Sequence, residues 1–95
     1  MKIQTTTEFR RKVERQIQYI SKDKPGAAKK FRNLIVSEIR KIPQMPFKNK
    51  KCKFFEDENV RELIVLGYSI IYQIEKEANQ IVVFAFHKWE DDLKK

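Results

Sequence analysis

VRELIVLGYSIIYQIEKEANQIVVFAFHKW, which runs from Val60 to Trp89, is the stretch of sequence that decides the fold. Most of its apolar residues are β-branched or aromatic, and they recur at the spacing of strands rather than helices. Gly67 separates a first apolar segment from a second, and the polar residues 77–80 separate the second from a third. Glycines and short polar segments at such positions are typical of hairpin turns. The stretch therefore predicts three antiparallel strands.

Alternation within the middle segment, residues 68–75, assigns a face of the sheet to each side chain. Successive residues of a strand point to opposite faces. One face receives Tyr68, Ile70, Tyr72 and Ile74, and the other receives Ser69, Ile71, Gln73 and Glu75. We expect the first face to be core and the second to be at least partly solvated.

Two amphipathic helices are predicted before these strands. Thr5–Glu8 offers a threonine N-cap with a glutamate three residues later, which is the form of a capping box. Apolar residues then recur at helical spacing as far as Ile20. Pro25 suits the first turn of a second helix, and Pro43 ends that helix. The short connection predicts an antiparallel helical hairpin.

Both helices need an apolar surface to cover, and the predicted sheet is the only other such surface in the chain. Residues 51–56 are expected to form a further strand before Val60, and Lys2–Thr5 is an extended start that could add one more. We expect one domain over residues 1–95. The predicted fold is α+β, a two-layer β-α-α-β-β-β arrangement in which the helical hairpin packs on a mainly antiparallel four-stranded sheet.

The composition excludes several classes of protein. The 95 residues are 41% hydrophobic and 36% charged, and no apolar run is long enough to span a membrane or to serve as a secretory signal. We therefore expect a cytoplasmic protein. One cysteine and one histidine are too few for a structural metal site, and two glycines are too few for a phosphate-binding glycine loop. We expect no metal and no cofactor.

The single cysteine, Cys52, lies among Lys50, Lys51 and Lys53. Their charges favour a reactive thiolate. The simpler interpretation is a small, partly buried strand residue.

Positive charge is concentrated in the first half of the chain. The net charge is +8, yet residues 1–53 hold 16 lysines and arginines against 4 acidic residues, whereas residues 54–95 hold 5 against 9. Such a field attracts polyanions, of which nucleic acid is the commonest. The alternative is a solvated basic surface that only keeps the protein in solution.

Lysines interleaved with phenylalanines are the best candidate for nucleic-acid binding. The lysines of this segment are Lys48, Lys50, Lys51 and Lys53. Phe47, Phe54 and Phe55 could stack on unpaired bases, although aromatic residues at strand spacing are usually core. Trp89 either covers the sheet or offers a further stacking face.

His87 is the one side chain with an ordinary pKa suited to acid-base chemistry at neutral pH. It is a candidate general acid or base, and the alternative is a strand-end histidine without a role. If Arg61 shares a face with His87, the two could bind one phosphate. The alternative for Arg61 is an ion pair with an acidic side chain on the neighbouring strand.

Five segments carry a family resemblance. They are YISKDKPGAAKKF (Tyr19 to Phe31), IRKIPQMPF (Ile39 to Phe47), VREL (Val60 to Leu63), GYSIIYQI (Gly67 to Ile74) and IVVFAFHKW (Ile81 to Trp89). Together they resemble the RelE/ParE superfamily of bacterial toxins, the toxic halves of type II toxin-antitoxin pairs. The resemblance implies a small basic toxin that is blocked by a short, partly disordered antitoxin.

The resemblance implies two kinds of target. RelE-like members cleave mRNA on the ribosome by attack of the ribose 2'-OH on the adjacent phosphate, and their catalytic positions correspond approximately to Lys51, Lys53 and His87. That branch usually has an arginine where this chain has Ser69, so Arg61 would have to replace it. ParE-like members inhibit DNA gyrase, and VREL and the last-strand histidine also occur among them.

We therefore expect a toxin that arrests growth by ribosome-dependent mRNA cleavage. Its predicted catalytic residues are His87, Arg61, Lys51 and Lys53. The alternatives are a gyrase inhibitor without chemistry of its own and a non-catalytic RNA-binding module.

Overall fold

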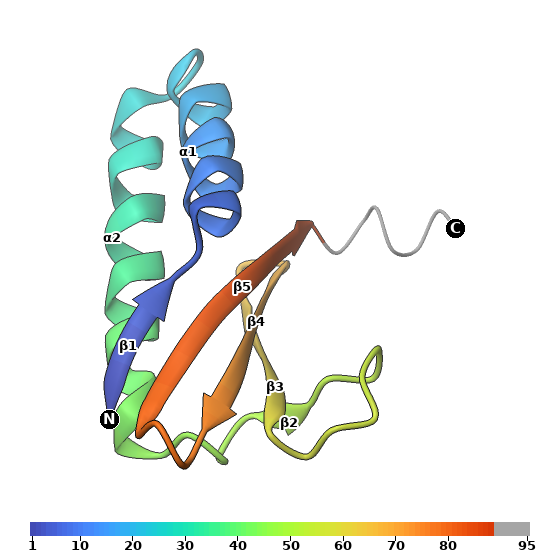
Figure 1. Ribbon diagram of the computed structural model, residues 1–95. Helices are drawn as coiled ribbons and strands as arrows, with labels where there is room; N and C mark the ends of the chain where they lie inside the picture. The colour runs from blue at the N-terminus through green and yellow to red at the C-terminus, as the bar shows by residue number, and fades with distance from the viewer. Residues whose placement is uncertain (89–95) are drawn as a thin grey trace.

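The computed structural model describes residues 1–88, in which a layer of two helices packs against one sheet (Figure 1). In chain order the elements are β1 (Lys2–Thr5), α1 (Thr7–Ser21), α2 (Pro25–Lys41), the short 3-10 helix η1 (Ile42–Gln44), β2 (Lys50–Lys51), β3 (Val60–Val65), β4 (Tyr68–Glu75) and β5 (Gln80–Lys88).

The sheet has five strands in the order β1-β5-β4-β3-β2. The predicted antiparallel meander is formed by β3, β4 and β5, and β2 pairs antiparallel with β3. β1 pairs parallel with β5 at the opposite edge. The α+β class and the helical hairpin are therefore confirmed. Within residues 1–88 the sheet has five strands rather than four, because both β1 and the short β2 join the three-stranded meander as edge strands.

The strand predicted at residues 51–56 is wrong in extent, because β2 covers only Lys50–Lys51. The Cys52 N–H still donates to the carbonyl oxygen of Val60 at 3.0 Å, which continues the ladder by one bond. The Phe55 N–H then donates to the Cys52 carbonyl oxygen at 3.3 Å and closes a turn. Residues 52–59 therefore form a loop, which projects at the sheet edge far from the helical hairpin (Figure 1).

Helix α1 begins one residue later than the predicted capping box. Thr6 is the N-cap, and its Oγ1 accepts a hydrogen bond from the Phe9 N–H at 3.1 Å. Thr5 is the last residue of β1, and its carbonyl and hydroxyl oxygens accept hydrogen bonds from Arg10 instead. Because Thr5 belongs to the strand, the next threonine caps the helix.

The main core lies between the helical hairpin and one face of the sheet. Helix α1 contacts it through Phe9, whose ring meets Phe86 edge-on at 6.2 Å, and α2 contacts it through Phe31, whose ring meets Tyr68 at 5.2 Å. The residues predicted for this face are all buried in that cluster: Tyr68, Ile70, Tyr72 and Ile74. The face assignment from alternation is confirmed.

Within residues 1–88, no helix covers the other face of the sheet, and we call it the open face (Figure 1). A second cluster of Cys52, Val60 and Ile71 lies on it, with Phe84 and Ala85 packed alongside. A bulge in β5 places both of these last residues there, because Ile71 is opposite Ala85 while Tyr72 is opposite Val83. The open face is therefore partly apolar.

Candidate functional site

The strand register places the predicted site residues on two different faces. Arg61 is opposite Tyr72, whose side chain lies in the main core, so Arg61 shares the helix-covered face. Ser69, three residues before Tyr72, is opposite His87. Because side chains alternate along a strand, Ser69 and His87 point to the open face. The shared phosphate site predicted for Arg61 and His87 is therefore not formed.

The guanidinium of Arg61 is held by backbone carbonyl oxygens. Its Nε donates to Glu58 at 2.8 Å, and its Nη1 donates to Asn49 at 3.0 Å and to Phe47 at 3.3 Å. Its Cζ also lies 5.0 Å from the centre of the Phe47 ring. Arg61 joins the segment before β2 to the loop before β3. The guanidinium therefore binds backbone carbonyl oxygens instead of forming the predicted alternative, an ion pair with an acidic side chain on the neighbouring strand.

Two of the predicted lysines also lie away from His87. Lys51 is opposite Arg61 in the sheet, and its Nζ lies 3.4 Å from Oε1 of Glu58. Both side chains of that ion pair are exposed, so it contributes little stability. Lys48 lines a shallow pocket beside Ile42 and Leu63, on the helix-covered side. Neither lysine is positioned to act together with His87.

Lys50, Lys53 and His87 gather at the open face. Lys50 is opposite Glu62 in the sheet. Because Lys50 is the neighbour of Lys51 in the same strand, its side chain lies on the other face. The Nζ of Lys53 lies 5.2 Å from the centre of the Phe54 ring, and that ring lies 6.4 Å from the imidazole of His87. This is the part of the predicted cationic site that the structure brings together.

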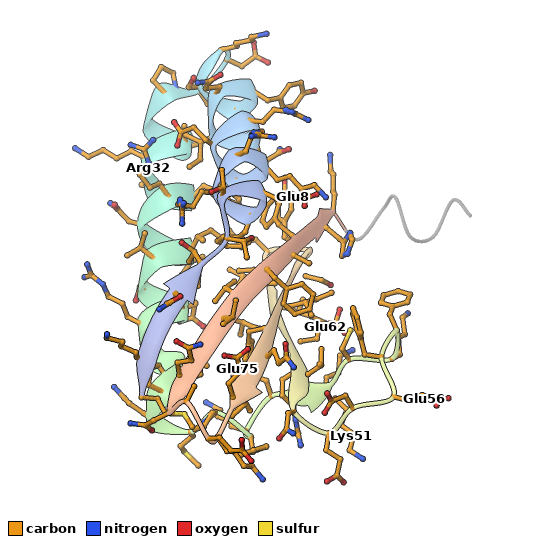
Figure 2. All side chains as sticks on the ribbon, in the orientation of Figure 1. Glu8, Arg32, Lys51, Glu56, Glu62 and Glu75 are labelled. Carbon is orange, nitrogen blue, oxygen red and sulfur yellow. The ribbon has the colours of Figure 1, made fainter. Side chains whose placement is uncertain are left out.

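A buried carboxylate, which was not among the predicted site residues, lies on the open face. Glu62 is only 4% exposed, and its Oε2 accepts a hydrogen bond of 2.5 Å from the Ser69 hydroxyl. Its Oε1 has no hydrogen-bond partner among the described residues and lies 3.7 Å from Nζ of Lys50 (Figure 2). Alternation along β3 and β4 could have placed Glu62 on the same face as Ser69. It could not have predicted that Glu62 is buried.

Cys52 is 1% exposed and belongs to the second cluster. Burial raises the pKa of its thiol, and the negative charge of Glu62 acts in the same direction. The neighbouring lysines oppose this change only weakly. The predicted small buried residue is therefore the better description, although Cys52 lies just after β2 rather than within a strand.

Tyr72 anchors the segment that enters β2. Its hydroxyl donates to the Pro46 carbonyl oxygen at 2.6 Å and accepts from Nδ2 of Asn49 at 3.1 Å. Burial raises the pKa of this hydroxyl. The hydroxyl therefore stays protonated at neutral pH and is part of the scaffold.

A separate apolar groove lies between β1, α1 and α2, with a cavity volume of about 480 Å³. Its floor includes Phe9, Ile17, Ile35 and Ile39. Its rim carries three arginines and one glutamate: Arg10, Arg32, Arg40 and Glu14. Arg32 Nη2 donates to both carboxylate oxygens of Glu14, at 3.0 and 3.2 Å, which leaves the rim predominantly positive.

Residues 1–88 contain no group of three histidine, cysteine, aspartate or glutamate side chains arranged to hold a metal ion. In the same residues, neither helix combines the length and apolar character that crossing a membrane requires. Trp89, predicted to bind nucleic acid, lies outside the described residues.

The family model described as the ParE toxin of the type II toxin-antitoxin system parDE matches residues 3–92. That match covers nearly the whole chain. The chain belongs to the ParE toxin family. A comparison with curated proteins finds no match.

Membership of the ParE toxin family confirms the resemblance to the RelE/ParE superfamily. It identifies the protein as the toxin of a type II toxin-antitoxin pair and implies an antitoxin partner. This ParE-family toxin has two distinct surfaces, the groove between β1, α1 and α2 and the open face of the sheet.

Proposed function

We propose that this ParE-family toxin arrests growth by binding DNA gyrase and inhibiting it, without ribonuclease chemistry of its own. One observation carries the proposal: the four side chains expected to act on RNA are divided between the two faces of the sheet. Arg61 and Lys51 share the helix-covered side, whereas His87 and Lys53 belong to the open face.

RNA cleavage by attack of a 2'-OH requires cationic groups around a single phosphate. Arg61 donates to three carbonyl oxygens and would have to give up those bonds to contact a phosphate. Ser69 occupies the position where the RNA-cleaving branch usually has an arginine, and its hydroxyl is held by the buried Glu62. These contacts favour a toxin that acts by occupying a surface of its target.

Ribosome-dependent mRNA cleavage is the second candidate function. The observation in its favour is that Lys50, Lys53 and His87 lie on the same face of the sheet. These groups gather beside the exposed ring of Phe54 on the open face. A reduced site of this kind would work without Arg61 and without Lys51.

A supercoiling assay tests the gyrase proposal. Purified toxin is titrated into gyrase, ATP and relaxed plasmid, and the supercoiled product is measured. We expect the product to fall as toxin is added and to recover when the cognate antitoxin is mixed with the toxin first. Gyrase that stays fully active at toxin concentrations that arrest growth would overturn the proposal.

We also propose that the antitoxin occupies the groove between β1, α1 and α2. The floor of the groove is apolar and three arginines surround it. Such a surface suits an amphipathic segment that has apolar anchors on one side and acidic residues beside them. If one segment of the antitoxin fills the groove, the rest of the antitoxin is available to contact the open face.

A further inference from the structure

Two neighbouring aromatic side chains on the open side of the molecule are exposed, although aromatic residues at this spacing were expected in the core. Phe54 is 54% exposed and Phe55 is 43% exposed. Each ring lies near an aromatic side chain of the sheet: Phe54 is tilted relative to His87 at 6.4 Å, and Phe55 meets Phe84 edge-on at 5.7 Å. We call Phe54, Phe55 and His87, together with Lys53, the aromatic pad.

The aromatic pad is held in place by its backbone. The Cys52 N–H bonds to Val60 at 3.0 Å, the Phe55 N–H bonds to the Cys52 carbonyl oxygen at 3.3 Å, and Cys52 itself is buried. At the far end of the loop, the Val60 N–H donates to the Asp57 carbonyl oxygen at 3.1 Å. The backbone that carries the rings is therefore held in place, which lowers the entropy that the loop loses on binding.

Two lysines lie near the exposed rings of the aromatic pad. The Nζ of Lys53 lies over the Phe54 ring at 5.2 Å, and the exposed side chain of Lys50 lies above the buried Glu62. Of the acidic residues in the loop, Glu58 is paired with Lys51 at 3.4 Å, and Glu56 points away from the sheet (Figure 2). Asp57 uses its Oδ1 to accept from the Asn59 N–H at 2.8 Å.

We infer that the aromatic pad binds an unpaired DNA strand, with bases stacked on Phe54 and Phe55 and phosphates contacted by Lys53 and Lys50. Exposed aromatic faces beside cations are the features that hold single strands, because each unpaired base offers a flat face for stacking. In a duplex the neighbouring base pairs cover those faces, and the loop presents no helix that could enter a major groove.

The inference rests on the proposed function in one respect. A toxin bound to gyrase lies beside DNA that the enzyme cuts, so unpaired bases come within reach of the aromatic pad. The strand would then be contacted by the open face while the rest of the toxin contacts the enzyme.

Fluorescence anisotropy with a labelled oligothymidylate of about 12 nucleotides tests the inference, since single-strand sites span about 4 to 16 nucleotides. We expect F54A/F55A to weaken binding about tenfold or more, because stacking on each ring is lost. The control is Phe47→Ala, which removes an exposed phenylalanine outside the aromatic pad. Its ring also has cations over it, Arg61 at 5.0 Å and Lys76 at 5.1 Å.

Further measurements make the outcome decisive. F54L/F55L keeps apolar side chains but removes the aromatic faces, so it should weaken binding as the alanine variant does. Thermal melting of every variant establishes that it is folded. Affinity should fall with salt with a log-log slope of about −1.4, as expected for two phosphate contacts, by Lys53 and Lys50, on a single strand. Equal affinities of F54A/F55A and Phe47→Ala would overturn the inference, as would tighter binding of a duplex or of the matching RNA.

The supercoiling assay separates this inference from the proposed function. A wild-type toxin that binds the oligonucleotide but does not inhibit gyrase would reject the gyrase proposal and leave the aromatic pad as a DNA site. Gyrase inhibition by a toxin that binds no oligonucleotide would reject the aromatic pad alone.

Discussion

At the scale of single residues, the buried Glu62 is the most demanding feature of the open face. A buried carboxylate is costly unless its oxygens are hydrogen-bonded or paired with a cation. Ser69 supplies the hydrogen bond to Oε2 and Lys50 supplies the nearby charge to Oε1. Ser69 therefore has a structural task.

Ser69→Ala should lower the free energy of unfolding by about 1–3 kcal/mol, because it leaves Oε2 of Glu62 buried without a donor. Urea denaturation measures this change. Ser21→Ala is the matched control, since the Ser21 hydroxyl donates to the Gln18 carbonyl oxygen on an exposed helix end. Equal effects of the two substitutions would contradict this account of Glu62.

Cys52 gives stability a dependence on pH at the alkaline end. Burial raises the pKa of its thiol in the folded protein. Above the ordinary thiol pKa of about 8.5, the unfolded chain releases this proton while the folded protein retains it. The unfolded state then binds fewer protons, so stability falls as pH rises through this window.

Urea denaturation at a series of pH values checks this prediction. Stability should be constant with respect to the thiol below its ordinary pKa and should decline above it. Tyr72, whose pKa is also raised, adds a decline in the same direction from about pH 10. Cys52→Ala should remove the earlier decline and keep the later one. The same pH profile for both proteins would show that the thiol has no part in it.

At the scale of elements, the β3–β4 hairpin contains a residue poorly suited to its conformation. Leu66 has φ of 51° and Gly67 has φ of 82°, so both central residues of the turn are left-handed. Turns of this kind favour Asn-Gly. Leu66 is also 66% exposed, so its side chain contributes little burial.

Leu66→Asn should therefore stabilise the protein by about 1 kcal/mol, since a leucine at positive φ costs about 1–2 kcal/mol. The expected rise in melting temperature is about 4–8 °C for a domain of this size. Asn79, with φ of 53° in the β4–β5 turn, offers the reverse substitution, and Asn79→Leu should lower the melting temperature. Changes of the same sign in both turns would contradict the backbone explanation.

Some elements could be predicted because their pattern depends on near neighbours alone. The alternation of apolar and polar residues along 68–75 fixed the core face of β4, and Pro25 and Pro43 marked the ends of α2 closely. Residues 51–56 were expected to form a strand because Phe54 and Phe55 are typical strand residues, whereas residues 52–59 form a loop. A turn closed by the Phe55 N–H has no strong signal in the sequence.

The candidate site was harder to predict than the elements, because it depends on register between strands. Arg61 and His87 are far apart in sequence, and only the pairing of each with β4 shows that they occupy opposite faces. The bulge at Phe84 also changes which residues of β5 reach the open face. Neither register nor bulge follows from composition.

At the scale of the whole molecule, two surfaces of different character lie on different sides. The groove between β1, α1 and α2 is apolar with a basic rim, and the open face carries the buried Glu62 and the aromatic pad. This separation suits a toxin that meets two macromolecules. The positive charge of the first half of the chain attracts acidic partners to the groove.

Val36→Glu tests the groove as the antitoxin site. Val36 lines the groove and is 41% exposed, so a glutamate there should repel an acidic antitoxin segment without disturbing the core. We expect antitoxin affinity to fall about tenfold or more, which corresponds to about 1.4 kcal/mol. Calorimetric titration measures this, with Tyr19→Glu as the control because Tyr19 is exposed on α1 and does not line the groove. Equal affinities of the two variants would place the antitoxin elsewhere.

The central claim is that the toxin does not cleave mRNA, because the groups expected to do so are divided between two faces of the sheet. Primer extension on translating ribosomes tests this claim most directly. Purified toxin is added to ribosomes that are translating a defined mRNA, and new 5'-OH ends are mapped. The account predicts no new ends inside codons at toxin concentrations that inhibit gyrase. New ends that appear with the wild-type toxin and disappear with His87→Ala would contradict it.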